Sequence, residues 1–445
     1  TDKNNWGPRF GFAWSPSIAK GMVFRGGYGL IYSPLTRGAV SSTSVNAGFS
    51  ATTSFSTLDN LNPAFYLNNG FPFHNLPEAQ PGAGFLSGQS INYVNPNNRV
   101  PYVQQWSFGI QAPVPGAMVL DVSYVGNRGT RLPWGSTINM NQLPQEALNN
   151  SILERVANPF EGILSGSLGG PTITRGQLMR QFPQYQNVSN LSLASANSTY
   201  HSLQTKLEKR FSHGVYLMTS YTYSKLLTDS SLGSGGVGGL GVTLQDAYNL
   251  RAEKGRSTND IRHRLVLAGS YDLPFGKGQR WATTGLVSHL AGGWQINSIF
   301  TAQSGIPLTI YSSPNLTQSL GGGSRPNRLC DGNLESGSRS NQQWFDTSCF
   351  APAGQFRFGN SGTGIINGPG ITNLDLSLFK NIPIRERFTL QLRGEFFNVL
   401  NHANFADPGT TQGVGGYGVI SATAGGTLDP MGGPRIGQVA LKLTF

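Results

Sequence analysis

The sequence is poor in charge and has no long apolar run. Asp, Glu, Lys and Arg make up 12% of its 445 residues, roughly half of the 25% share that is usual in soluble globular domains. Because no stretch reaches about 18 consecutive apolar residues, a transmembrane helix is excluded. Glycine is abundant instead, with 59 residues, and aromatic residues make up 11%. A transmembrane β-barrel is compatible with this composition, since only every second residue of its strands has to face lipid.

Cysteine is almost absent as well. The two cysteines, Cys330 and Cys349, lie in a segment rich in Gly, Ser and Asn. No second cysteine pair or nearby histidine completes a zinc site. We therefore predict a local disulfide formed in an oxidising compartment, the alternative being two unpaired thiols in a loop. On the chain-entropy estimate, such a bridge would stabilise its loop by roughly 3 kcal/mol.

Groupings of catalytic residues are lacking too. The six histidines are scattered, and none has the spacing of a metal motif or of a nucleophile–base pair. We therefore expect no enzyme, no cofactor and no metal site. The net charge of +11 and the pI of about 9.7 come from dispersed basic residues. A solvated, basic lumen and loop surface explains them better than nucleic-acid binding, so no nucleic-acid partner is expected.

What the sequence does contain is alternation of apolar and polar residues with period 2, which is typical of half-buried strands. About eleven segments show it, most of them close to the roughly 9–11 residues that a tilted membrane strand needs. No helices are expected. The predicted strands are residues 9–14, 23–32, 103–111, 117–126, 201–211, 215–225, 261–273, 293–303, 372–380, 388–400 and 437–445.

The connections between these segments alternate between short and long. Short connections follow the first, third, fifth and ninth strands, and long connections follow the second, fourth, sixth, eighth and tenth. After the seventh strand, residues 274–292 form a connection of medium length. Short periplasmic turns and long extracellular loops are typical of outer-membrane barrels. The sequence therefore predicts an all-β, transmembrane antiparallel β-barrel, with a final strand that runs inward. The long segments are Gly-rich and of low complexity, so we expect loops with little core of their own.

Alternation also predicts which side chains face the lumen. The apolar positions of each strand are expected to face lipid, and the polar positions are expected to solvate the barrel interior. The lumen-facing candidates are Arg25, Arg264, Gln295, Asn297, Gln391, Arg393, Glu395 and Lys442. General lumen polarity explains these residues better than contact with a specific ligand, and ligand recognition is expected in the extracellular loops.

Several longer stretches resemble the C-terminal half of Oar-like TonB-dependent receptors. The most specific are "IRHRLVLAGSYDLPFG" and "GEFFNVLNHANF", and "YVQQWSFGIQ" and the terminal "PRIGQVALKLTF" add to them. The resemblance covers nearly the whole chain. It implies that residues 1–445 are the C-terminal portion of a plugged barrel of about 22 strands, of which the eleven predicted strands would be the second half.

The resemblance also implies parts that this sequence does not contain. "TDKNNWGPRF" has neither a basic nor an apolar region of a signal peptide. A signal peptide, a carboxypeptidase-regulatory-like domain and a plug are therefore expected before residue 1, which would be an N-terminal truncation. The contact with TonB would lie in that region. At the other end, Val439, Leu441, Leu443 and Phe445 match the terminal signal that the barrel assembly machinery reads in such proteins.

The function that follows is an outer-membrane TonB-dependent receptor or transporter, located in the bacterial cell outer membrane, to which this chain contributes the barrel wall and ligand-binding loops. The expected partners are outer-membrane lipid and lipopolysaccharide, the TonB complex, the barrel assembly machinery and an unknown extracellular ligand. Two alternatives remain open: a surface adhesion or assembly protein without transport, and a secreted soluble β-rich binding protein whose apolar faces are buried in a sandwich.

Overall fold

The computed structural model describes most of the chain. The described residues are 5–18, 21–33, 63, 65–69, 84, 86–134, 138–164, 166–191, 193–230, 243–385, 388–424 and 433–445. No helix in these ranges has the length and apolar character needed to cross a membrane.

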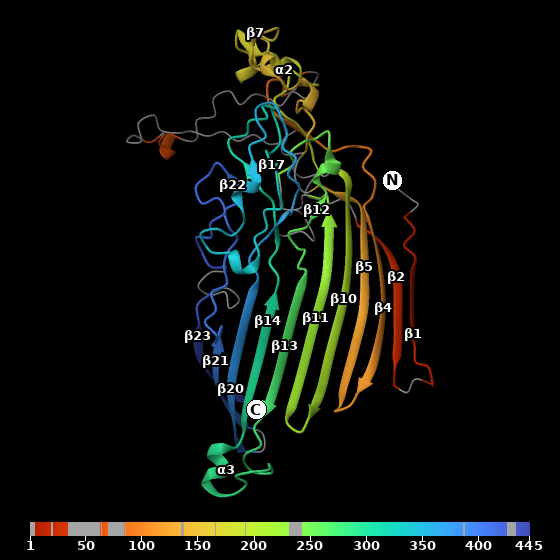
Figure 1. The fold of residues 1–445 in the computed structure, drawn as a ribbon, viewed down its shortest axis with the longest axis vertical. Coiled ribbons are helices and arrows are strands. Elements are labelled where there is room, and N and C mark those ends of the chain that lie inside the picture. The colour runs from red at the N-terminus through yellow and green to blue at the C-terminus, as the bar shows by residue number, and fades with distance from the viewer. Residues whose placement is uncertain are drawn as a thin grey trace.

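Eleven long strands form one antiparallel sheet in chain order (Figure 1). They are β1 (Arg9–Trp14), β2 (Val23–Tyr32), β4 (Tyr102–Val114), β5 (Met118–Pro133), β10 (Ala194–Ser212), β11 (Val215–Thr228), β13 (His263–Asp272), β14 (Trp294–Gln303), β20 (Ile371–Arg385), β21 (Phe388–Phe397) and β23 (Ile436–Thr444). Each overlaps one predicted segment, so the all-β antiparallel fold is confirmed. Within the described ranges, β1 and β23 are the edge strands and no pairing joins them.

The register divides the sheet into two faces of different character. Directly paired residues of antiparallel strands lie on the same face. Large apolar residues pair with one another across the sheet on one face: Trp14 with Phe24, Tyr28 with Trp106, Tyr124 with Phe108 and Leu203, Leu267 with Phe300, Ile296 with Leu378, and Leu392 with Leu441. No second sheet covers this face in the described part of the chain. The soluble-sandwich alternative needs a second layer over the apolar face, and the described residues do not supply one.

Connections of different kinds gather at the two ends of the strands. Residues 115–117 and 213–214 make tight turns at one end, and residues 134–193 and 304–370 make long loops at the other (Figure 1). The connection between β13 and β14 lies at the short-turn end and contains helix α3 (Gly285–Ala291). The expectation that the chain has no helices is wrong here: α3 is too short to show a periodic signal in the sequence.

The long loops contain small elements of their own. Their strands are β3 (Ile91–Tyr93), β6 (Ile138–Asn139), β7 (Arg155–Ala157), β8 (Thr172–Thr174), β9 (Val188–Asn190), β12 (Gly255–Arg256), β15 (Pro307–Leu308), β16 (Tyr311–Ser312), β17 (Asn327–Arg328), β18 (Phe350–Ala351), β19 (Ile366–Asn367) and β22 (Thr411–Gln412). Their helices are α2 (Arg175–Leu178) and the 3-10 turns η2 (Leu67–Asn69), η3 (Gln145–Ala147), η4 (Asn150–Leu153), η5 (Gly166–Leu168), η6 (Leu250–Glu253), η7 (Ser336–Ser338) and η8 (Thr347–Cys349).

The buried cores also lie in the long loops. One core contains Leu308, Ile310, Phe345, Cys349, Phe350 and Ile366. A second contains Trp134, Ile138, Ala196, Leu244 and Ala247, and a third contains Leu143, Leu148 and Ile152. The expectation of loops with little core is wrong. The apolar residues that build these cores are separated by Gly-rich stretches, and they meet only when different loops pack together.

Candidate ligand-binding site in the long loops

A buried ion pair joins two of the long loops. Arg325, between β16 and β17, donates from Nη1 to Glu253 Oε2 (2.6 Å) and from Nη2 to Oε1 (3.0 Å). Glu253 ends η6, and the two side chains are 2% and 0% exposed. Bidentate geometry is required here, because a buried ion pair compensates its desolvation only when the hydrogen bonding is good.

Two glutamine side chains extend this connection to a third loop. Gln142, in the β5–β10 loop, donates to the Gln245 carbonyl oxygen (2.9 Å) and accepts from the Ala247 N–H (2.8 Å). Gln245 Nε2 donates to the Gly359 carbonyl oxygen (3.0 Å), and Gln245 Oε1 accepts from the Arg325 N–H (2.9 Å). Both glutamines are buried. These side-chain amides hold the three loops together, in addition to backbone hydrogen bonds such as that from the Gly323 N–H to the Leu244 carbonyl oxygen (2.7 Å).

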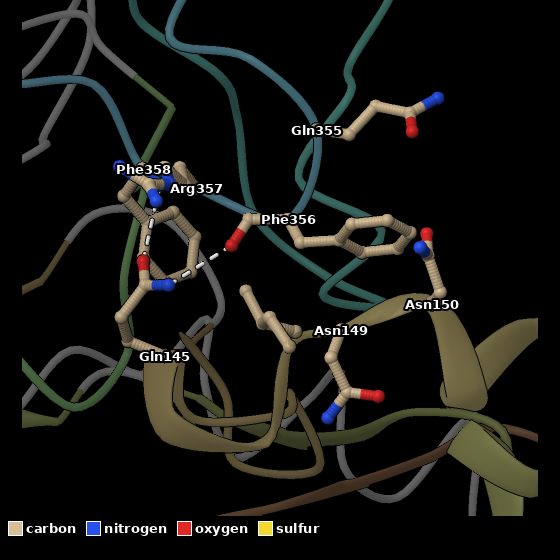
Figure 2. A pocket seen from close by; sticks show the side chains of 8 residues that line it. Gln145, Asn149, Asn150, Gln355, Phe356, Arg357 and Phe358 are labelled. Carbon is tan, nitrogen blue, oxygen red and sulfur yellow. Dashed lines mark hydrogen bonds between the residues drawn. The ribbon is translucent and has the colours of Figure 1, made fainter.

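A pocket of about 590 Å³ opens where two of these interlocked loops meet. Figure 2 shows Gln145 of η3 donating from Nε2 to the Phe356 carbonyl oxygen (2.9 Å), while its Oε1 accepts from the Phe358 N–H (3.1 Å). Phe356 and Phe358 also contribute their aromatic rings to the lining. Leu148, Asn149, Asn150, Gln355 and Arg357 complete it. Amide groups, one guanidinium and apolar rings are a combination that can orient a polar organic ligand.

A second pocket, of about 490 Å³, shares Gln145 and Phe358 with the first. Glu146, Asp246 and Tyr248 are among its lining residues. Burial raises the pKa of the Asp246 carboxyl, and the nearby Glu146 carboxylate adds to this rise. Burial together with Asp246 raises the pKa of Tyr248. The second pocket is therefore more acidic in character than the first, although Arg325 lies in its wall.

Cys330 and Cys349 form a disulfide in the β14–β20 loop, with their Cα atoms 4.9 Å apart. Asp346 lies near both sulfur atoms. A bonded pair of sulfurs offers no thiolate, so this group is not suited to a metal.

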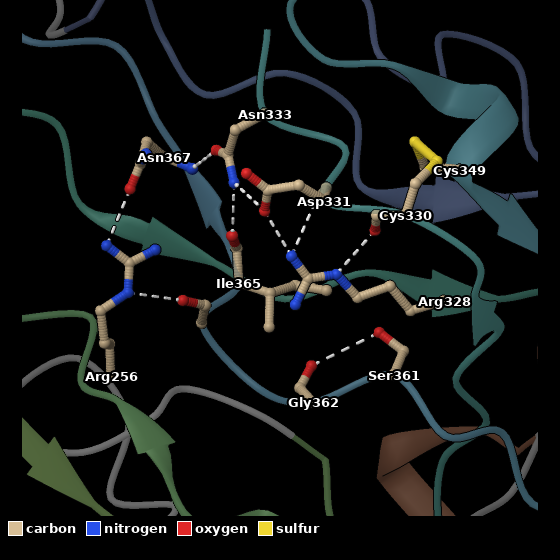
Figure 3. A network of polar contacts seen from close by, with 11 residues as sticks. Arg256, Arg328, Cys330, Asp331, Asn333, Cys349, Ser361, Gly362, Ile365 and Asn367 are labelled. Carbon is tan, nitrogen blue, oxygen red and sulfur yellow. Dashed lines mark hydrogen bonds and ion pairs between the residues drawn. A yellow bond between two sulfur atoms is a disulfide. The ribbon is translucent and has the colours of Figure 1, made fainter.

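A polar network surrounds the disulfide (Figure 3). Arg328 Nε donates to the Cys330 carbonyl oxygen (2.9 Å) and its guanidinium forms an ion pair with Asp331. Arg256 of β12 reaches the same region, donating to the Gly364 carbonyl oxygen (2.8 Å) and to Asn367 Oδ1 (2.7 Å). Burial lowers the pKa of Arg256. The disulfide therefore belongs to a fixed part of the loop assembly.

The structure places the eight candidate lumen residues on one face of the sheet, opposite the apolar face. Pairing relates them: Arg264 pairs with Gln303, Gln295 and Arg393 both pair with Phe379, Gln391 pairs with Lys442, and Arg25 pairs with Gly109. Asn297 and Glu395 both pair with Ser377. They share a face, but they are spread over five strands and form no single cluster.

Several of these side chains bind neighbours on the same face. Arg25 Nη2 donates to Gln111 Oε1 (3.0 Å) and Gln295 Nε2 donates to Asp272 Oδ1 (2.7 Å). Arg393 Nε donates to Gln391 Oε1 (2.5 Å). The first two contacts join neighbouring strands and the third lies within β21. Contacts of this kind suit a polar wall better than a ligand site.

The four residues of the expected assembly signal lie at the end of the chain. Val439, Leu441 and Leu443 alternate along β23 on the apolar face, and together with Phe445 they are exposed. Their role in assembly stays a prediction.

Residues that the sequence reasoning missed make up most of the loop site. Gln142, Gln145, Gln245 and Arg325 have no periodic or motif context in the sequence. Glu253 lies in the mainly basic stretch "RAEKGR", which gives no sign that this side chain is buried. The one available signal was a lone arginine in the Gly-rich "GGGSRPN", since an isolated charge among small residues needs a partner if it is buried.

The sequence matches the family described as outer membrane beta barrel domain over residues 1–438. The chain belongs to this family. It is therefore a protein of the bacterial outer membrane, in which the short turns are periplasmic and the long loops are extracellular.

Three solved structures with a similar fold are distant from this chain in sequence. The outer membrane transporter YddB from Escherichia coli is 8% identical with a TM-score of 0.49, and 98% of this chain covers 40% of that protein. The ferric citrate transporter FecA is 9% identical with a TM-score of 0.42, and 98% of this chain covers 38% of it. The FrpB iron transporter from Neisseria meningitidis is 9% identical with a TM-score of 0.40, with coverage of 98% and 39%. The chain thus spans about two fifths of each. None of the curated proteins matches the sequence.

Proposed function

We propose that this chain is the wall and the extracellular ligand-binding part of an Oar-like TonB-dependent receptor that transports its ligand across the outer membrane. The observation that carries the proposal is the interlocked assembly of three extracellular loops, which presents two adjoining pockets above a sheet with a polar lumen face. A barrel that served only as a structural scaffold would not require loops fixed by a buried ion pair.

The two pockets suggest the chemistry of the ligand. Amide side chains and Arg357 can bind hydroxyl, carboxylate or peptide groups, and the rings of Phe356 and Phe358 can contact sugar or side-chain faces. A glycan or a peptide fits this lining. The ligand would bind at the loops, and a plug supplied by an N-terminal region would respond to TonB and open the lumen. The chain itself would carry out no catalytic step.

An uptake experiment tests the proposal. The full-length protein is produced in its native host, and the cells are incubated with fluorescent oligosaccharides and peptides, with and without a proton uncoupler. Accumulation that the uncoupler or deletion of TonB abolishes is expected. Surface binding without any energy-dependent accumulation would instead support the adhesion alternative and would reject transport.

Variants of the pocket link uptake to this site. Asn150→Ala combined with Arg357→Ala is expected to weaken surface binding of the transported compound severalfold. Arg251→Ala removes an exposed arginine of the same loops that does not line either pocket, so it serves as the matched control. Equal binding by both variants would show that the ligand binds elsewhere.

A further inference from the structure

The periplasmic connection between β13 and β14 carries a helix whose apolar side chains point outward. In α3, Leu286, Val287 and Leu290 are 74%, 62% and 65% exposed, whereas Ser288 is buried. A helix on the surface of a water-soluble domain normally shows the opposite pattern, with its apolar stripe facing the core.

The three exposed residues form one stripe. At about 100° per residue, positions i, i+1 and i+4 fall within one third of the helix circumference. Trp281, just before the helix, is exposed as well, and its ring lies against Phe275 at a centroid distance of 5.5 Å. The same connection therefore exposes an aromatic residue, fixed in position by Phe275, as well as the apolar stripe of the helix.

Contacts from the barrel strands hold the helix in this orientation. Lys380 of β20 is 8% exposed and donates from Nζ to the carbonyl oxygens of His289 (2.6 Å), Leu290 (3.0 Å) and Gly292. Trp294 Nε1 donates to the Leu290 carbonyl oxygen (2.9 Å). A lysine that binds the last carbonyl groups of a helix satisfies acceptors that the helix itself leaves free.

These contacts also place α3 at the lipid boundary. Trp294 and Lys380 are register partners, and the next pair on the same face, Ile296 and Leu378, belongs to the exposed apolar surface that contacts lipid. The helix lies at the short-turn end of β13 and β14 (Figure 1). Its apolar stripe therefore continues the lipid-contacting surface at the periplasmic rim.

The charges of this connection have one sign. Between residues 273 and 293 there is no Asp or Glu, whereas Lys277, Arg280 and His289 are exposed. Arg280 Cζ lies 5.4 Å from the centre of the Trp281 ring. An apolar stripe, a tryptophan and nearby cations are the features of helices that lie in the interface of a bilayer with anionic headgroups.

We propose that α3 is an interfacial membrane anchor, which inserts Leu286, Val287 and Leu290 into the phospholipid of the periplasmic leaflet while Lys277 and Arg280 bind phosphate headgroups. A rigid anchor of this kind would fix the depth of the β13–β14 hairpin in the membrane. It would act independently of which ligand the extracellular loops bind.

Spin labelling measures the depth of the helix. Single cysteines replace Leu286, Leu378 or Ser336 in the full-length protein, in which Cys330 and Cys349 are occupied in the disulfide. Each labelled variant is refolded into vesicles of phosphatidylethanolamine and phosphatidylglycerol. Heat-modifiable migration on a gel establishes folding. Accessibility to oxygen marks the bilayer, and accessibility to a nickel chelate marks water. The label at 286 is expected to behave like the lipid-facing label at 378, with an oxygen-to-nickel ratio severalfold above that of the loop label at 336.

Two results would overturn the anchor. A label at 286 that behaves like the one at 336 would place the helix in water, and a label shielded from both reagents would indicate a protein partner. The headgroup contact has its own test in phosphatidylcholine vesicles. Adding phosphatidylglycerol is expected to raise the ratio at 286, and Lys277→Gln with Arg280→Gln is expected to abolish that rise. An equal ratio in both lipids without these substitutions would overturn the headgroup contact.

Discussion

Arg325 and Glu253 form a bidentate ion pair with N–O distances of 2.6 and 3.0 Å, and water reaches neither side chain to a significant extent. Seventy-two residues separate them in the chain. The pair joins the β11–β13 loop to the β14–β20 loop, and the Glu253 carbonyl oxygen also accepts a hydrogen bond from Thr363 Oγ1 (2.9 Å). The rigidity of the extracellular assembly therefore depends on a contact that no local sequence pattern encodes.

Removing one partner of this pair is expected to loosen the loops strongly. Glu253→Gln leaves the Arg325 charge buried without an anion, which costs about 3–5 kcal/mol in comparable sites. Hydrogen exchange of residues 243–260 and 323–328 in the refolded protein measures this loss of loop stability as a loss of protection. Arg175→Ala is the control, because Arg175 and Glu154 form an ion pair of the same length in the exposed part of the loops, where such pairs contribute about 0–1 kcal/mol.

A double substitution separates the charge from the packing. Glu253→Leu with Arg325→Met is expected to recover most of the lost protection, since a buried pair replaced by apolar residues of similar size is often nearly neutral. Equal loss in the single and double variants would mean that a hydrogen bond which an apolar side chain cannot make, that from the Gln245 N–H to Glu253 Oε1 (3.3 Å), matters as much as the charges.

The disulfide is expected to stabilise its own loop and little else. Replacing both Cys330 and Cys349 by serine should lower the local unfolding free energy of residues 330–349 by roughly 3 kcal/mol, because the closed segment regains its chain entropy. Limited proteolysis of intact cells measures this as faster cleavage within the loop. Reducing agent should speed cleavage of the unsubstituted protein and leave the double variant unchanged; an effect on both would point to another cause.

The strands could be predicted from the sequence, and the loop assembly could not. The alternation of apolar and polar residues, as at Val439, Leu441 and Leu443, is a local signal with period 2. It can be read from the sequence without knowing which strand lies beside it. Gln142 and Gln245 give no such signal, because their partners lie about a hundred residues away or on backbone atoms. Helix α3 was missed for the same reason: its end is held by Lys380, which follows it by some ninety residues.

The stability of the extracellular loops is expected to fall as the pH rises above the acidic range. Burial raises the folded-state pKa of the Asp246 carboxyl above its ordinary value of 3.8. The folded protein therefore binds more protons than the unfolded chain, so the stabilising contribution is complete below the unfolded pKa and is lost as the pH rises through the folded pKa.

Asp246→Asn should remove this dependence and raise the stability at neutral pH, while its Oδ1 can still accept the hydrogen bond from the Tyr248 N–H (2.9 Å). Hydrogen exchange of residues 243–253, corrected for intrinsic rates, measures the difference between pH 4 and pH 7. Glu335→Gln, at an exposed position of the neighbouring loop, is the control. A pH profile that Asp246→Asn leaves unchanged would assign the effect to other carboxylates.

The hydroxyl of Tyr417 offers a substitution that should stabilise the protein. Its oxygen is buried and has no hydrogen-bond partner among the described residues, and burial raises its pKa. The ring itself packs edge-on against Phe345 of the largest loop core, with centroids 5.3 Å apart. Tyr417→Phe keeps this contact and removes an uncompensated polar group, so it should raise loop stability by about 1 kcal/mol.

Tyr248→Phe is the matched control for this substitution, because the Tyr248 hydroxyl donates to the Gln142 carbonyl oxygen (2.9 Å). Losing that hydrogen bond should lower the stability of the loops by about 1 kcal/mol. Hydrogen exchange of the loop cores compares the two variants under one set of conditions. If both substitutions destabilise equally, the Tyr417 hydroxyl has a partner in solution, and a ligand or water bound beside Phe345 would be the group to seek. If Tyr417→Phe raises the stability of the loops and Tyr248→Phe lowers it, the loop core tolerates the buried Tyr417 hydroxyl at a measurable energetic cost.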